Sequence, residues 1–302
     1  MSVSTTQTAS PSATAGPARR AVMSNHPFRF GVSLINVGSR SAWRDRVREV
    51  EDLGYDVLQM PDHLGMQSPF PALVAAADVT SMRLGTYVLN AGIASPAYLA
   101  RDVADTQRLT DGRLELGLGA GYMPNEFEAV GLPFGTGGER LGKLKATLAA
   151  TRELLAAEAD QPVPPIMLAG SGDRMLRFGA READIFSFSI MAGVTEGVPP
   201  EEAFARRVRV LREAAGERAD KIELNLFVAA VGESAEKLDL AIIRQASGLD
   251  DASLNQLPGV LIGSPGEIAD RLRRYHEEYG VSYISVLEPH RVAFAEVIKH
   301  LR

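Results

Sequence analysis

Residues 83–118 read RLGTYVLNAGIASPAYLARDVADTQRLTDGRLELGL and set a pattern that the rest of the chain repeats. The apolar run Arg83–Asn90 is typical of a strand. Ser95-Pro96 then supplies a helix N-cap followed by proline at the first helical position. That helix ends at Asp111-Gly112, and a second strand follows over Arg113–Leu118. Strand, helix and strand in this order predict a parallel pair joined by a right-handed crossover.

The same alternation extends in both directions. Further strands are expected at Phe28–Leu34, Asp56–Met60, Pro165–Ala169, Asp184–Phe188, Ile222–Val231 and Val281–Leu287. Helices are expected from about Ser41, at Pro69–Thr80, Glu139–Ala157, Asp173–Glu182, Glu201–Gly216 and Ser234–Gly248, from a capping box at Ser264–Glu267, and at Ala293–Leu301. About eight strand–helix units predict a single closed (β/α)₈ barrel over residues 26–302. The alternative is an open doubly wound sheet, but no dinucleotide fingerprint follows the first strand.

Composition excludes several classes of protein. The chain has 302 residues, 45% of them hydrophobic and 23% charged, with a net charge of -6 and no cysteine. These values are ordinary for a globular domain and give no basic surface for nucleic acid. The apolar runs are too short to span a membrane. Residues 1–25 are expected to be a disordered tail without the apolar core of a secretory signal, unless Met23 is the true start. We expect a cytoplasmic protein.

Function in a barrel concentrates at the C-terminal ends of the strands, and this singles out His63. It is one of five histidines and the one that directly ends a predicted barrel strand. Imidazole can donate or accept a proton near pH 7, which suits acid–base work or hydrogen bonding to a heterocycle. The alternative is a histidine that only caps a backbone carbonyl. The neighbouring Asp62 either orients the His63 loop or caps the following turn.

Two further segments lie at strand ends. Gly170-Ser171-Gly172 precedes a helix, so its backbone N–H groups and the helix N-terminus suit a phosphate, although such a turn can also be purely structural. Residues 119–138 are expected to form a long structureless connection, which is typical of a binding loop. Within it Asn125 either binds a ligand or caps a helical turn. The other strand ends offer no second histidine and no Gly-x-Ser-x-Gly elbow, which argues against a metal site and against a serine hydrolase.

The motifs then match a known family. Leu53-Gly54-Tyr55-Asp56 through Pro61-Asp62-His63, the stretch Thr110–Gly121, the pair Asn125-Glu126, and Gly263-Ser264-Pro265 occur in the expected order. The sequence after about Phe28 resembles the luciferase-like monooxygenase superfamily, and specifically its branch of oxidoreductases that use the deazaflavin coenzyme F420.

The resemblance implies a barrel, usually homodimeric, that holds a flavin-like ring at the strand ends and transfers a hydride to or from a small organic substrate. It implies that Asp62 and His63 lie beside the ring and that Val88, Leu89 and Asn90 lie under it, with a non-proline cis peptide placed at Val88-Leu89. It also implies that Asn125 contacts the cofactor and that Gly170, Ser171 and Gly172 hold its phosphate.

One position departs from the family's sugar-phosphate dehydrogenases, which carry glutamate where this chain has Tyr122. Loss of that carboxylate argues against the same sugar phosphate as substrate. Two alternatives stay open: an FMN-dependent monooxygenase on the same fold, and a barrel that binds F420 without turnover. Both F420 and FMN present a tricyclic ring and a phosphate, so the residues alone do not decide between them.

Overall fold

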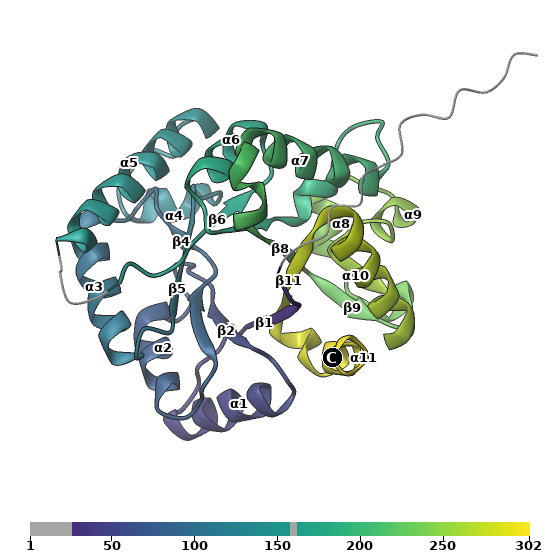
Figure 1. Ribbon diagram of the computed structural model, residues 1–302, viewed down its shortest axis with the longest axis horizontal. Helices are drawn as coiled ribbons and strands as arrows, with labels where there is room; N and C mark the ends of the chain where they lie inside the picture. Colours follow the sequence, from purple (N-terminus) through teal and green to yellow (C-terminus); the bar gives the residue numbers. More distant parts are fainter. Residues whose placement is uncertain (1–25, 158–161) are drawn as a thin grey trace, which may run out of the picture.

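Strands and helices alternate along the chain and close into a barrel surrounded by helices (Figure 1). The computed structural model describes residues 26–157 and 162–302. The barrel strands are β1 (Arg29–Ser33), β2 (Val57–Met60), β3 (Arg83–Thr86), β5 (Leu114–Gly119), β6 (Ile166–Gly170), β7 (Ile185–Phe188), β8 (Glu223–Val228) and β11 (Val281–Leu287). All their pairings are parallel, and β1–β11 and β3–β5 close the ring. The predicted (β/α)₈ barrel is confirmed.

The outer layer consists of α1 (Arg40–Asp52), α2 (Pro69–Ala77), α3 (Pro96–Leu109), α5 (Gly137–Ala156), α6 (Asp173–Glu182), α7 (Pro200–Ala215), α10 (Pro265–Tyr279) and α11 (Arg291–Leu301). The predicted capping box of α10 is present, with the Ser264 hydroxyl accepting from the N–H of Glu267 and the Glu267 carboxylate accepting from Ser264. Among the helices of the described residues, none combines the length and the apolar character needed to cross a membrane.

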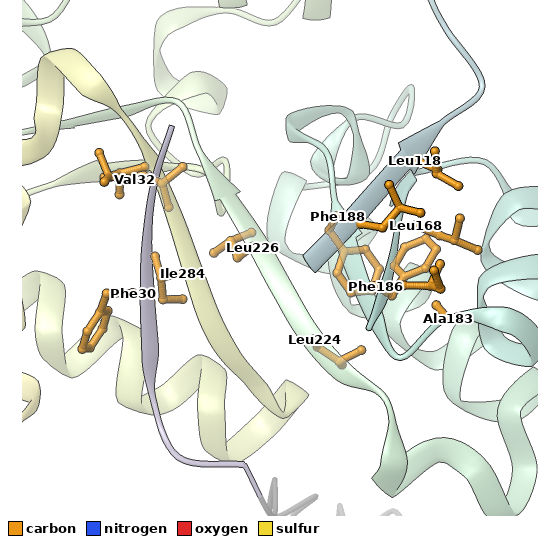
Figure 2. Close-up of a cluster of buried hydrophobic side chains, with 14 of the residues drawn as sticks. Phe30, Val32, Leu118, Leu168, Ala183, Phe186, Phe188, Leu224, Leu226 and Ile284 are labelled. Carbon is orange, nitrogen blue, oxygen red and sulfur yellow. The ribbon is translucent and has the colours of Figure 1, made fainter. Parts of the chain in front are cut away.

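Side chains alternate between the inside of the barrel and the helices. On β8, Leu224 and Leu226 belong to the main hydrophobic core, as do Phe186 and Phe188 on β7 (Figure 2). Asn225, which lies between the two leucines, is fully buried and hydrogen-bonds Ser187 and Tyr87. The strand period of two therefore places an apolar layer under the helices and a polar column inside the barrel.

An ionic network fills the N-terminal end of the barrel. Arg29 lies 2.7 Å from Glu115 and 2.6 Å from Glu223, and Arg83 lies 2.7 Å from Glu115. These charged residues stand at the beginnings of four strands. A ligand that enters the barrel must therefore approach from the C-terminal ends.

The structure corrects several boundaries. The predicted strand Arg83–Asn90 is divided into β3 and β4 (Leu89–Asn90), and the peptide bond between Tyr87 and Val88, which lies between these two strands, is cis. The long connection 119–138 contains a helix, α4 (Pro124–Ala129), so the prediction of a structureless loop was wrong.

The predicted strand Ile222–Val231 was too long. It divides at Ala229, whose N–H donates to the carbonyl of Gly259, and the chain continues as β9 (Ala230–Gly232) beside β10 (Val260–Ile262). The predicted helix Ser234–Gly248 reduces to α8 (Ala241–Ser247), with α9 (Asp251–Leu254) after it. Short 3-10 helices complete the described chain: η1 (Ile190–Gly193), η2 (Gly216–Lys221), η3 (Ala235–Lys237) and η4 (Glu288–His290). Residues 1–25, including Met23, lie outside the described residues.

Candidate active site

His63 lies at the C-terminal mouth of the barrel, where β2 has ended. Its Nδ1 is 2.7 Å from Oε1 of Glu126, and its Nε2 is 3.3 Å from the hydroxyl of Tyr122. The His63 and Tyr122 rings meet edge to face, with centroids 5.6 Å apart. Both ring nitrogens of His63 therefore have a partner, and both partners come from the segment after β5. The ends of β2 and β5 therefore bring together His63 and Glu126, which are 63 positions apart in the sequence.

Glu126 is the residue of the site that sequence reasoning missed. It was noted only as part of the Asn125-Glu126 motif, yet its carboxylate is 3% exposed and its second oxygen accepts from Nδ2 of Asn90 at 3.2 Å. The available signal was the register of α4, in which Glu126 and Phe127 face inward while Asn125 is exposed. A carboxylate on the inner face of a short helix needs a polar partner. The predicted contact of Asn125 with a cofactor stays a prediction.

Asn90, at the end of β4, connects the segment after β2 with helix α4. Its backbone N–H donates to Oδ2 of Asp62 at 3.1 Å, its Nδ2 donates to Glu126, and its Oδ1 accepts from the N–H of Gly92 at 3.0 Å. Asp62 therefore orients the backbone beside the mouth rather than capping its own turn. Burial raises the pKa of Asp62, and the charge of Glu126 raises it further, while the hydrogen bond from Asn90 opposes both effects.

The apolar side chain of Val88 lies at the mouth and packs against β5. The cis peptide lies at Tyr87-Val88, one bond before the predicted Val88-Leu89, so that placement was wrong. A Cβ atom added to Gly117 or Gly119 would come within 2.9 or 2.8 Å of the Val88 methyl groups. Two glycines on β5 therefore let Val88 pack against the strand. The hydroxyl of Tyr87 turns inward to Asn225 and Ser187, and burial raises its pKa.

The segment Gly170-Ser171-Gly172 ends at α6, with Gly172 as the N-cap. Glycine supplies no capping side chain, and a Cβ atom built on Gly172 has no neighbour within 4 Å. The helix N-terminus is therefore open. Asp173 points aside, with its carboxylate 3.9 Å from Arg207, and the guanidinium of Arg174 approaches Gly138 at the start of α5. The structure thus places Arg174 between two helix N-termini.

His290 also lies at the mouth, so the expectation that the other strand ends offer no second histidine was wrong. It ends η4, directly after β11. Burial lowers the pKa of His290, and hydrogen bonding to the backbone of Val231 and Ala229 opposes that shift. This histidine therefore ties the barrel to β9. In the described part of the chain, no three acidic or histidine side chains lie close enough together to hold a metal ion.

A charged groove between α7 and α10 is a separate surface feature. It is lined by Glu201, Arg206, Arg209 and Arg274 among others. Arg274 donates to Glu201 at 2.9 Å and Tyr279 donates to the same carboxylate at 3.1 Å, so these polar groups satisfy one another. The groove lies on the helical layer and contains none of the predicted residues.

Comparison with known proteins agrees with this geometry. The family model described as luciferase-like monooxygenase matches residues 22–244. An F420-dependent glucose-6-phosphate dehydrogenase from Beutenbergia cavernae is 32% identical over 164 residues, which are 45% of this chain and 48% of that protein. The chain thus spans about half the length of this curated relative.

Two solved structures share the fold. The coenzyme F420-dependent tetrahydromethanopterin reductase from Methanopyrus kandleri superposes with a TM-score of 0.70 at 17% identity, covering 92% of this chain and 100% of that one. A long-chain alkane monooxygenase superposes with a TM-score of 0.72 at 16% identity, covering 92% of this chain and 91% of that one. At such identities the likeness shows the barrel fold alone.

Proposed function

Because this chain belongs to the luciferase-like monooxygenase family, we propose that it is an oxidoreductase that uses coenzyme F420 and acts on a small organic substrate. The observation that carries the proposal is the imidazole of His63, held by a buried carboxylate at the open end of the barrel. The choice of F420 is supported by the curated relative, which is named F420-dependent.

The residues at the mouth fit a planar ring with an anionic chain. Val88 offers a half-buried apolar side chain, and Gly117 and Gly119 leave room for it against β5. The open N-terminus of α6 at Gly172 offers backbone N–H groups and a partial positive charge, with Arg174 beside it. When bound, a deazaflavin supplies the hydride, so the protein must supply position and a proton rather than a nucleophile.

Each predicted site residue then has a proposed role. His63 supplies or receives the proton that accompanies hydride transfer, and Asp62 and Asn90 fix the backbone beside it. Val88 and Leu89 support the ring, Asn125 contacts it from α4, and Gly170, Ser171 and Gly172 bind the phosphate. Homodimerisation and a cytoplasmic location, both expected from the sequence, complete the proposal and are testable by light scattering and by fractionation.

The experiment is a titration of the purified full chain with F420 and, separately, with FMN, followed by turnover of reduced F420 with a panel of enones and imines. We expect tighter binding of F420 than of FMN, and oxidation of reduced F420 that requires a substrate. The H63A variant should bind F420 like the wild type and lose turnover by about 10²-fold or more.

The alternatives give different results in the same experiment. An FMN-dependent monooxygenase on the same fold would prefer FMN and consume oxygen. A barrel that binds F420 without catalysis would bind it and show no turnover with any substrate. Either result contradicts the proposal.

A further inference from the structure

Three side chains at the mouth form a continuous hydrogen-bonded line. Glu126 Oε1 lies 2.7 Å from Nδ1 of His63, and Nε2 of His63 lies 3.3 Å from the hydroxyl of Tyr122. Exposure rises along the line: Glu126 is 3% exposed, His63 is partly exposed, and Tyr122 is 71% exposed. The line therefore runs from the protein interior to the open mouth and ends on a phenol.

The direction of the hydrogen bonds follows from the donors and acceptors. A carboxylate can only accept, so Nδ1 of His63 donates to Glu126. The second oxygen of Glu126 accepts from Asn90, which holds the carboxylate in place. In neutral imidazole Nε2 then carries no hydrogen and accepts from the hydroxyl of Tyr122. This is the logic of a carboxylate–imidazole–hydroxyl triad, with a phenol in place of the usual nucleophile.

The environment of Tyr122 keeps its hydroxyl protonated. Although most of the Tyr122 side chain is exposed, the protein around it partly desolvates the phenol and raises its pKa, and the negative charge of Glu126 raises the pKa further. The titratable groups on the neighbouring elements include His63 and Asp62 after β2, Glu126 on α4, and Arg140 on α5, which donates to the carbonyl of Gly121. A phenol that stays protonated can donate a hydrogen bond, and then a proton, to a substrate atom.

We propose that Tyr122 is the catalytic residue that passes the proton to the substrate, with His63 behind it and Glu126 as the positioning residue of the relay. The proposal rests on the F420-dependent activity proposed above and goes beyond it, because it identifies the outer group and the substrate class. The substrate carries a carbonyl or imine whose heteroatom accepts the hydrogen of the phenol.

The step balances in the reducing direction. When bound, reduced F420 would supply the hydride to the substrate carbon, and the π electrons of the carbonyl or imine would move to its oxygen or nitrogen. Before this transfer, Nε2 of the neutral His63 ring takes a proton from water, and the imidazolium, held by Glu126, then donates from Nε2 to the phenol oxygen. The substrate heteroatom takes the proton of the Tyr122 hydroxyl, while the phenol oxygen takes the Nε2 proton of His63. His63 is left neutral, with its Nδ1–H on Glu126, and takes its next proton from water. The substrate is reduced by two electrons and F420 is oxidised by two.

The surroundings of Tyr122 favour a neutral substrate. Leu64 and Met66 follow His63 and are 50% and 45% exposed, so apolar surface flanks the relay. Arg140 reaches the residue before Tyr122, and its guanidinium is engaged there, because it donates to the carbonyls of Gly121 and Gly135. A neutral carbonyl or imine compound with apolar flanks fits this rim better than a sugar phosphate does.

The kinetic test compares the wild type with Tyr122→Phe, using reduced F420 with cyclohex-2-enone and with a cyclic imine. Phenylalanine keeps the ring and removes only the hydroxyl. We expect kcat to fall by about 10²-fold, with the KM of the substrate and the Kd of F420 changed by less than about threefold. The matched control is Tyr98→Phe, since Tyr98 is 64% exposed on α3 and stacks on Arg101. It should behave like the wild type. A Tyr122→Phe enzyme that keeps half or more of the wild-type kcat overturns the relay.

A second measurement needs no cofactor. Nitrogen-15 NMR of the His63 ring in the apo protein should show the hydrogen on Nδ1 in the wild type, and Glu126→Gln should shift the population toward the Nε2–H form. A wild-type ring with its hydrogen on Nε2 also overturns the relay.

The outcomes separate the two proposals. A wild type that binds no F420 contradicts the proposed function, whereas normal F420 turnover with an unaffected Tyr122→Phe variant contradicts only the relay.

Discussion

At the scale of single residues, the site depends on how closely its polar groups are packed around Asn90. This residue is 5% exposed and bonds to Asp62, Glu126 and Gly92. Glu126 is buried, and its carboxylate has hydrogen bonds to two specific partners, His63 and Asn90, which offset the cost of burying its charge. Removing either partner would leave a buried charge with one hydrogen bond fewer, which is why we treat these residues as one unit.

Gly121 tests this packing. Its φ is +76°, and a Cβ atom there would lie 2.3 Å from Oδ1 of Asn90. Gly121→Ala should therefore lower the free energy of unfolding by about 2 kcal/mol or more, through the left-handed backbone and the clash together. A fall in Tm of about 4–8 °C by calorimetry would correspond to that loss.

Gly131 provides the matched control, because its φ is +70° and a Cβ atom there meets nothing within 4 Å. Gly131→Ala isolates the backbone cost and should lower the free energy of unfolding by about 1 kcal/mol. Equal losses in the two variants would show that the contact with Asn90 is unimportant.

At the scale of elements, the sequence predicted best where local signals and tertiary structure agree. The helix Asp173–Glu182 and the strand Val281–Leu287 have the bounds expected from their patterns. The capping box at Ser264 and Glu267 is a purely local signal, and it was read correctly.

Elements defined by long-range contacts were predicted poorly. Strand β10 has three residues and exists because β9 lies beside it, so its own pattern carries little information. The cis peptide lies at Tyr87-Val88 and involves no proline, so the sequence gives no local signal for it. The predicted position, Val88-Leu89, was wrong by one bond. Glu126 belongs to the site because α4 turns it toward His63, which no spacing in the sequence reveals.

The start of α6 allows a test of the proposed phosphate site. Gly172 has φ −76° and ψ 146°, a conformation open to any residue, and its missing side chain faces open space. Gly172→Val should therefore leave the apo fold nearly intact, with a fall in Tm of at most about 4 °C for the poorer N-cap. The affinity for F420 should fall at least tenfold because the methyl groups obstruct the backbone N–H groups.

Gly266→Val is the control, since Gly266 lies near the start of another helix, α10, and a Cβ atom added there likewise meets nothing within 4 Å. Its affinity for F420 should match the wild type. Unchanged affinity in Gly172→Val would place the phosphate elsewhere.

At the scale of the whole molecule, the two ends of the barrel are built differently. Ion pairs of Arg29 with Glu115 and Glu223 occupy the N-terminal end. The C-terminal end instead presents the imidazole of His63, the phenol of Tyr122 and the side chain of Val88, with β9 and β10 beside it. In this fold, residues at the N-terminal end of the barrel usually stabilise the structure, and residues at the C-terminal end usually carry the chemistry. The closed barrel holds strand ends that are distant in sequence within hydrogen-bonding distance of one another.

A crystal structure of the full chain with F420 tests the central claim most directly. The account predicts electron density for the tricyclic ring against Val88, within contact of His63, and for the phosphate at the N–H groups after Gly172. Density at the N-terminal end of the barrel, or a mouth that stays empty at saturating F420, would contradict it.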